Sequence, residues 1–140
     1  MLRQTQRGGP SPTLLLGVGA DPQQAAKARA EGADLIDVRG ATPGALAAIR
    51  ASLPAAVLWT GSLADPLDAD QLAARAGAAR GDGPAGRVTP AAVIATAAVC
   101  TWLGAPVVRS RHTQAVRRAI DMTASIAGHR PPSRTVRGLA

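Results

Sequence analysis

Short apolar runs alternate along this chain with segments of helical periodicity. The runs occupy residues 13–18, 35–38, 56–59 and 107–108. Each is followed by a turn and a segment of helical period, as in Leu46, Ile49 and Leu53. Such alternation predicts parallel strands joined by helices. We therefore expect an α/β fold with about four parallel strands, either a partial (β/α) barrel or a small open sheet.

Four of the expected helices begin with a capping residue followed by proline. The pairs are Asp21-Pro22, Thr42-Pro43, Asp65-Pro66 and Thr89-Pro90. A short polar side chain caps the first amide groups, and proline suits the first helical position. The third of these helices is expected to carry Leu67 and Leu72. A last helix is expected over residues 113–127.

The length of 140 residues indicates one domain, over residues 13–128, and is too short for a complete (β/α)8 barrel of at least about 200 residues. Residues 1–12 and 129–140 are rich in Gly, Pro, Ser and Arg and are expected to be a disordered leader and tail. The glycine-rich stretch near residues 77–88 interrupts the alternation and predicts a loop or the remnant of a deletion.

Polar residues at the ends of the second and last strands are the candidates for a binding site. In folds of this kind, ligands bind beyond the carboxyl ends of the strands. Arg109 and Arg111 could hold a phosphate, together with the amide groups that open the following helix, and His112 is a further candidate at the same strand end. A solvated basic turn is the alternative for that cluster. Asp37 is a further candidate for ligand binding, and its alternative role is that of a buried hydrogen-bond acceptor. Thr42 is another candidate, and its alternative role is that of a helix N-cap.

Two segments, Asp34 to Gly44 and Leu103 to Ala127, resemble dihydropteroate synthase, which joins a pterin to p-aminobenzoate. The first is similar to the family's second strand, Ile-Asp-Val-Gly-Gly, and its loop; the second is similar to its last strand, Val-Arg-Val-His-Asp. The resemblance implies a fragment of a (β/α)8 barrel. It also implies that Arg109 corresponds to the family arginine that helps hold the pterin diphosphate. Arg111 stands where the family has histidine, and His112 is shifted by one place.

Several residues that the resemblance requires for catalysis are missing. The family uses an asparagine after the first strand to help bind magnesium, yet this chain has no asparagine, and its only lysine, Lys27, falls in the first helix. The sequence therefore favours a non-catalytic pterin- or phosphate-binding module related to folate biosynthesis. Two alternatives stay open: an active synthase completed by a partner, and a structural or interaction remnant without a ligand site.

The net charge of +7 comes almost entirely from arginine and favours an anionic small molecule, such as a pterin diphosphate, as ligand. We expect no cofactor and no metal held by the protein alone, although Mg²⁺ could accompany a diphosphate. The arginines are scattered and no aromatic platform exists, so nucleic acid is not an expected partner. Cys100 lies within an apolar run and is expected to be a buried thiol.

Residues 88–108 carry no charge, and about 20 such residues could span a bilayer. Gly104 and Pro106 interrupt the run, so we expect no membrane segment and a cytoplasmic protein. A partial barrel leaves strand edges unpaired. We therefore expect a homodimer of two half-barrels placed face to face.

Overall fold

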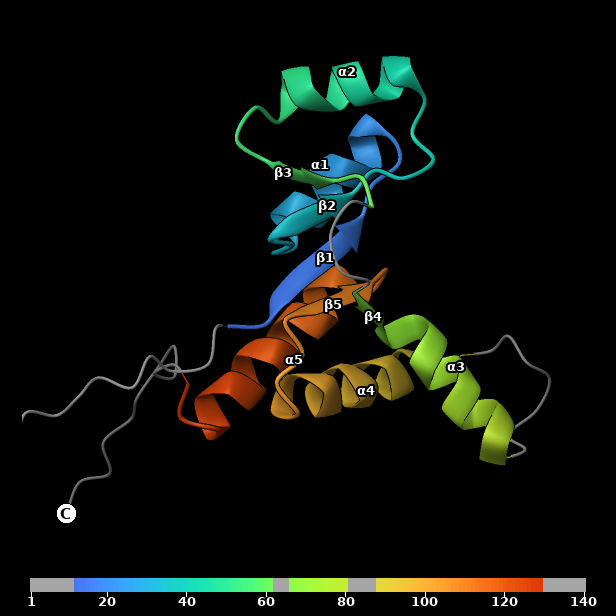
Figure 1. Cartoon of the computed structure of the whole chain (residues 1–140), viewed down its shortest axis with the longest axis vertical. Coiled ribbons are helices and arrows are strands. Elements are labelled where there is room, and N and C mark those ends of the chain that lie inside the picture. Colours follow the sequence, from blue (N-terminus) through green and yellow to red (C-terminus); the bar gives the residue numbers. More distant parts are fainter. Residues whose placement is uncertain (1–11, 62–65, 81–87, 130–140) are drawn as a thin grey trace, which may run out of the picture.

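The computed structural model describes residues 12–61, 66–80 and 88–129. Strands and helices alternate along most of the chain (Figure 1). The elements are β1 (Leu14–Val18), α1 (Pro22–Ala30), β2 (Leu35–Asp37), α2 (Pro43–Ser52), β3 (Val57–Trp59), β4 (Leu67–Asp68), α3 (Ala69–Arg80), α4 (Pro90–Trp102), β5 (Val107–Ser110) and α5 (Thr113–Ile126).

The strands form one parallel sheet in the order β3-β2-β1-β5-β4. The connections that contain helices run from β1 to β2, from β2 to β3 and from β4 to β5. Each leads to the neighbouring strand, and all three lead in the same direction across the sheet. With right-handed crossovers, this order places all the helices on one face. Figure 1 shows α1 and α2 beside the β1–β3 half and α3, α4 and α5 beside the β4–β5 half. The arrangement is that of an open part of a (β/α) barrel, as the sequence predicted.

The hydrophobic core lies between the sheet and the helices, in two clusters. In the larger cluster, Leu15 and Val108 from the strands pack against α3, α4 and α5. In the smaller one, Ile36 packs against α1 and α2. Successive residues of a strand point to opposite faces. Asp37 and Arg109, next to Ile36 and Val108, therefore point to the face that no helix covers.

The four predicted strands are confirmed, but the structure contains a fifth, β4, which the sequence analysis missed. Leu67 was expected in a helix and instead lies in this strand, and α3 begins only at Ala69. A strand of two residues is too short for any periodic signal. A local signal was nevertheless present, because Asp68 followed three residues later by Gln71 has the spacing of a capping box.

Three of the predicted helix starts are confirmed by hydrogen bonds. Each cap accepts a backbone N–H three residues on, at 2.8 Å for Asp21 and 3.2 Å for Thr42 and Thr89. Asp65 lies outside the described residues. The last helix differs, because its N-cap residue, His112, makes no capping hydrogen bond with its side chain.

The proposed leader and tail fall almost wholly outside the described residues, as do residues 81–87 of the proposed loop. Residues 77–80 belong to α3, which corrects the start of that loop. The uncharged stretch of the sequence forms a helix of 13 residues, α4, and a strand. In the described part of the chain, no helix is long and apolar enough to cross a membrane.

Candidate functional site

The carboxylate of Asp37 receives four hydrogen bonds on the helix-free face of the sheet. Arg39 donates its backbone N–H and its Nε to Oδ1, both at 3.0 Å, and its Nη2 to Oδ2 at 2.9 Å. Arg109 donates Nε to Oδ2 at 2.7 Å. Asp37 is only 3% exposed. Its sequence alternative, a buried hydrogen-bond acceptor, is therefore what the structure shows.

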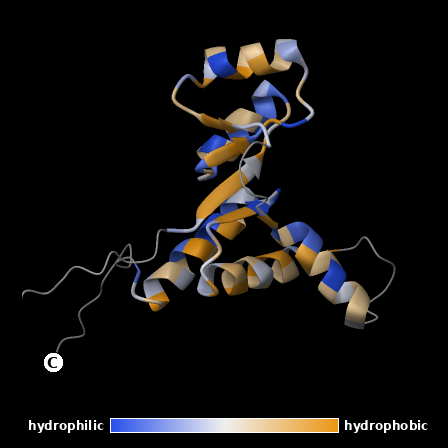
Figure 2. Cartoon of the chain, in the orientation of Figure 1, coloured by the Kyte–Doolittle hydropathy of each residue, from blue (hydrophilic) through white to orange (hydrophobic). Residues whose placement is uncertain are grey.

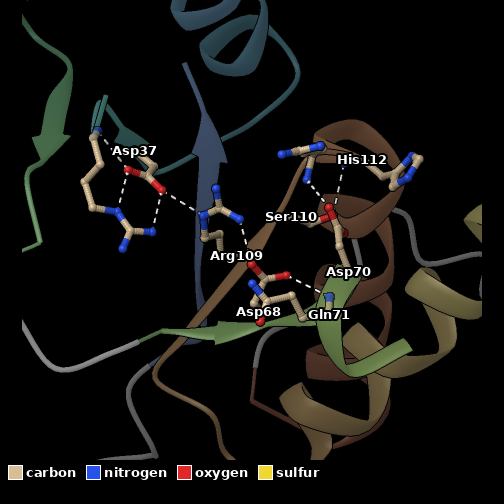
Figure 3. Close-up of polar contacts among 9 residues, drawn as sticks. Asp37, Asp68, Asp70, Gln71, Arg109, Ser110 and His112 are labelled. Atoms are coloured by element: carbon tan, nitrogen blue, oxygen red, sulfur yellow. Dashed lines mark hydrogen bonds and ion pairs between the residues drawn. The ribbon is translucent and has the colours of Figure 1, made fainter. Parts of the chain in front are cut away.

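Arg109 links three strands of the sheet. From β5 its guanidinium reaches Asp37 of β2, and its Nη1 donates to Oδ2 of Asp68 on β4 at 2.6 Å (Figure 3). Two carboxylates thus surround one guanidinium. The two carboxylates occupy the Nε and Nη1 groups of Arg109, so a phosphate ester would find Nη2 as its donor but would lie close to two negative charges.

A third aspartate, Asp70, fixes the start of α3 to the end of β5. Asp70 accepts a hydrogen bond from the Ser110 hydroxyl at 2.7 Å and from the Arg111 backbone N–H at 3.0 Å. Ser110 in turn accepts the His112 N–H at 3.0 Å. Sequence analysis missed Asp68 and Asp70 because their segment was assigned to a helix. Together these contacts set the direction in which the chain leaves β5.

Two opposed effects act on the pKa of Asp37. Burial raises the pKa of this carboxyl, but the hydrogen bonds from Arg39 and Arg109 outweigh burial, so the net pKa is below the ordinary value of 3.8. For Arg109, burial lowers the pKa and the bond to Asp37 and the nearby Asp68 charge raise it, with a net increase. Both groups are therefore charged at neutral pH.

Acidification should weaken the fold through Asp37. Its folded-state pKa is depressed, so its contribution is fully present above the unfolded value of 3.8 and is lost as the pH falls through the lower folded value. We expect the urea midpoint of the wild type to fall between about pH 5 and about pH 2, with a shallower fall in Asp37→Asn. Parallel curves for the two proteins would show that Asp37 contributes nothing to acid sensitivity.

A pocket of about 510 Å³ opens between the end of β1, helix α1 and the start of α5. Its polar side chains come from two sides: Arg111 and Thr113 at and just before the start of α5, and Gln24, Lys27 and Glu31 on α1, so that the remaining lining is apolar. The remaining lining residues are Val18, Ala20 and Ala28. Lys27 and Glu31 form a loose ion pair of 3.9 Å. The pocket is thus bordered by two cations and one carboxylate.

Hydrogen-bond donors at this pocket lack partners. Thr113 is 3% exposed and lines the pocket, and its hydroxyl forms no hydrogen bond with the described part of the chain. The first intrahelical N–H bond of α5 is that of Val116 to His112. The preceding amides of the first turn have no intrahelical acceptor, and the side chain of the N-cap residue, His112, does not cap them. Such a helix start attracts an anion.

The five candidate residues from the sequence fall into three places. Asp37 and Arg109 meet in the ion network. Arg111 and His112 lie at the start of α5, where Arg111 borders the pocket. Thr42 is apart from both, because it caps α2 by accepting the Ala45 N–H. The helix-cap interpretation of Thr42 is therefore confirmed.

The donor set does not fit a magnesium ion held by the protein alone. Asp37 and Asp68 are each engaged by an arginine. Within residues 12–61, 66–80 and 88–129, no group of three or more His, Cys, Asp or Glu side chains is placed to hold a metal.

One segment of the chain resembles known proteins. Over 47 residues it is 49% identical to proteins named inactive dihydropteroate synthase 2 from Mycobacterium tuberculosis and Mycobacterium bovis. The similarity is confined to that segment of the chain. The match covers 34% of this chain and 15% of the length of those relatives. No family model matches the sequence, and no solved structure matches it either.

Proposed function

We propose that this chain is a non-catalytic, dihydropteroate synthase-like module that binds a phosphorylated small molecule, with a pterin diphosphate as the preferred ligand. The observation that carries the proposal is the hydroxyl of Thr113, which forms no hydrogen bond within the described residues and lies at an uncapped helix start beside the pocket and Arg111. The oxygen atoms of a phosphate accept hydrogen bonds from groups of all these kinds.

In this proposal Arg109 positions the site and does not touch the ligand. Its two ion pairs hold β5 between β2 and β4. The contacts of Asp70 then orient the residues after β5, so that Arg111 and the start of α5 border the pocket. Arg111 and His112 remain candidate ligand contacts. Asp37, on β2, instead holds Arg109 in place through an ion pair.

The absence of catalysis is supported by two separate observations. The chain has no asparagine, and its only lysine, Lys27, is on α1. The relatives that match part of the chain are themselves named inactive. With p-aminobenzoate and a pterin diphosphate, the purified protein should give no turnover. Turnover by the purified protein would contradict the proposal, whereas turnover that requires an added partner protein would support the alternative of a synthase completed by that partner.

Removal of the Arg111 charge should weaken anion binding. A charge-assisted hydrogen bond contributes about 1.5 to 3 kcal/mol, so Arg111→Ala should raise the Kd at least about tenfold. Glu31→Gln should lower the Kd a few-fold, because it removes a carboxylate from the rim. Isothermal titration calorimetry with hydroxymethyl-dihydropterin diphosphate measures both.

Arg118→Ala is the matched control, since it removes the same charge from an exposed position of α5 and should bind like the wild type. Titrations with inorganic pyrophosphate and with the pterin that lacks its diphosphate measure the binding of each half of the ligand separately. Equal losses of affinity in Arg111→Ala and Arg118→Ala would show that the binding is only unspecific attraction of an anion to a basic protein. No heat with any of the three compounds would overturn the proposal.

A further inference from the structure

The pocket at the start of α5 has a second polar wall, which helix α1 provides. Gln24, Lys27 and Glu31 line the pocket from this side, together with Ala28. Residues three and four apart lie on one face of a helix, so these four side chains face the pocket together. Figure 2 shows hydrophilic positions on α1, in contrast to the largely apolar α4. We call these four residues the α1 wall.

The α1 wall has hydrogen-bonding capacity that the described part of the chain does not use. Of Gln24, only the backbone N–H has a partner there, Asp21, and the side-chain amide has none. The Glu31 carboxylate lies 3.9 Å from Nζ of Lys27, which is longer than a hydrogen bond. An amide donates and accepts, a carboxylate accepts and an ammonium group donates. Hydroxyl groups fit this mixture, because each of them both donates and accepts.

The two sides of the pocket differ in charge. Arg111 and the amides that begin α5 make one side positive. On the α1 wall the charges of Lys27 and Glu31 cancel, and Gln24 is neutral. A second phosphate on this wall would lie beside the Glu31 carboxylate, which would repel it. The pocket therefore suits a ligand with one anionic end and an uncharged, hydrogen-bonding remainder.

The length and the apolar lining of the pocket agree with this kind of ligand. Helix α1 begins at the carboxyl end of the sheet, where α5 also begins, and leads away from it. From Gln24 to Glu31 the wall extends for about 10 Å, at 1.5 Å per residue. The apolar residues that line the pocket, Val18, Ala20 and Ala28, are small and aliphatic. Such side chains pack against the C–H groups of a saturated carbon chain or ring.

We propose that this pocket also binds monophosphate esters of small polyhydroxylated compounds, such as a pentose phosphate. The phosphate lies at the start of α5, on Arg111 and Thr113, and the hydroxyl groups lie along the α1 wall. This inference rests on the proposed function, because the phosphate occupies the same anion site. It adds a second class of ligand, which is saturated and hydroxylated and competes with a pterin diphosphate.

Three ligands of graded structure test the inference by isothermal titration calorimetry. Inorganic phosphate probes the anion site alone, pentyl phosphate adds five carbons without hydroxyl groups, and ribose 5-phosphate adds five carbons with them. The Kd of ribose 5-phosphate should be at least about tenfold below that of pentyl phosphate, since each hydrogen bond to a hydroxyl contributes a few-fold.

Gln24→Leu should raise the Kd of ribose 5-phosphate about fivefold and leave the Kd of inorganic phosphate unchanged, because the amide contacts only the hydroxyl groups. Gln23→Leu is the matched control, since it makes the same change at an exposed neighbouring position of α1 that does not line the pocket. It should bind both ligands like the wild type. Circular dichroism verifies that both variants fold.

Equal Kd values for ribose 5-phosphate and pentyl phosphate would overturn this inference, and the proposed function would stand as long as inorganic phosphate or pyrophosphate binds. Equal losses of affinity for ribose 5-phosphate in Gln24→Leu and Gln23→Leu would also overturn it, because the α1 wall would then make no specific contact. No binding of inorganic phosphate or pyrophosphate to the wild type would overturn the proposed function and this inference together.

Discussion

Replacing Arg109 by methionine should be the most destabilising single change on the helix-free face of the sheet. The substitution keeps the aliphatic stem but removes the only link between Asp37 and Asp68 that the structure shows. Loss of one partner from a buried ion pair costs about 3 to 5 kcal/mol, because the remaining charge stays buried. Urea unfolding followed by circular dichroism measures the loss.

Two further variants test the origin of this effect. Asp37→Asn combined with Arg109→Met should cost less than the sum of the single changes, since it removes both charges of one pair. Arg118→Ala, at an exposed position, should change the free energy of unfolding by no more than about 0.5 kcal/mol. A loss below about 1 kcal/mol for Arg109→Met would refute a structural role for the network.

Gly19→Ala should also destabilise the fold, through packing alone. A Cβ at Gly19 would lie 2.7 Å from the Ala25 Cα and 2.7 Å from the Ile36 Cγ2, at the junction of β1, α1 and β2. One atom belongs to the backbone of α1, so relief requires the helix to move. Overpacking of this kind costs about 1 to 3 kcal/mol, measurable as a lower urea midpoint.

Gly77→Ala is the matched control, because it makes the same chemical change within α3 with no atom within 4 Å of the new Cβ. A glycine in a helix destabilises it by roughly 0.5 to 1 kcal/mol relative to alanine, so this variant should be more stable than the wild type. Equal effects of the two substitutions would contradict the packing argument.

The alternation of elements was predictable because each unit carries its own signals. Three pairs of a capping residue and a proline each predict a helix start that the structure confirms: Asp21-Pro22, Thr42-Pro43 and Thr89-Pro90. The two-residue strand β4 was not predictable from periodicity, because its assignment depends on pairing with β5. Tertiary pairing, rather than local preference, decides so short an element.

The proximity of Asp37 and Arg109 was predictable, but the contacts that they make were not. The rule that parallel strands present their carboxyl ends together correctly placed Asp37 and Arg109 near each other. The sequence did not show that Asp68 would supply a second carboxylate, since that residue comes from the missed strand. Whether an arginine meets a ligand or a carboxylate of its own chain depends on such long-range neighbours.

Binding of a phosphorylated ligand at the start of α5 can be tested directly by nuclear magnetic resonance of the labelled protein, titrated with inorganic pyrophosphate. We expect the amide signals of Thr113, Gln114 and Ala115 to shift most and to reach saturation, because these groups lack helical acceptors. Small shifts spread over exposed arginines such as Arg50 and Arg118, without saturation, would contradict binding at this site.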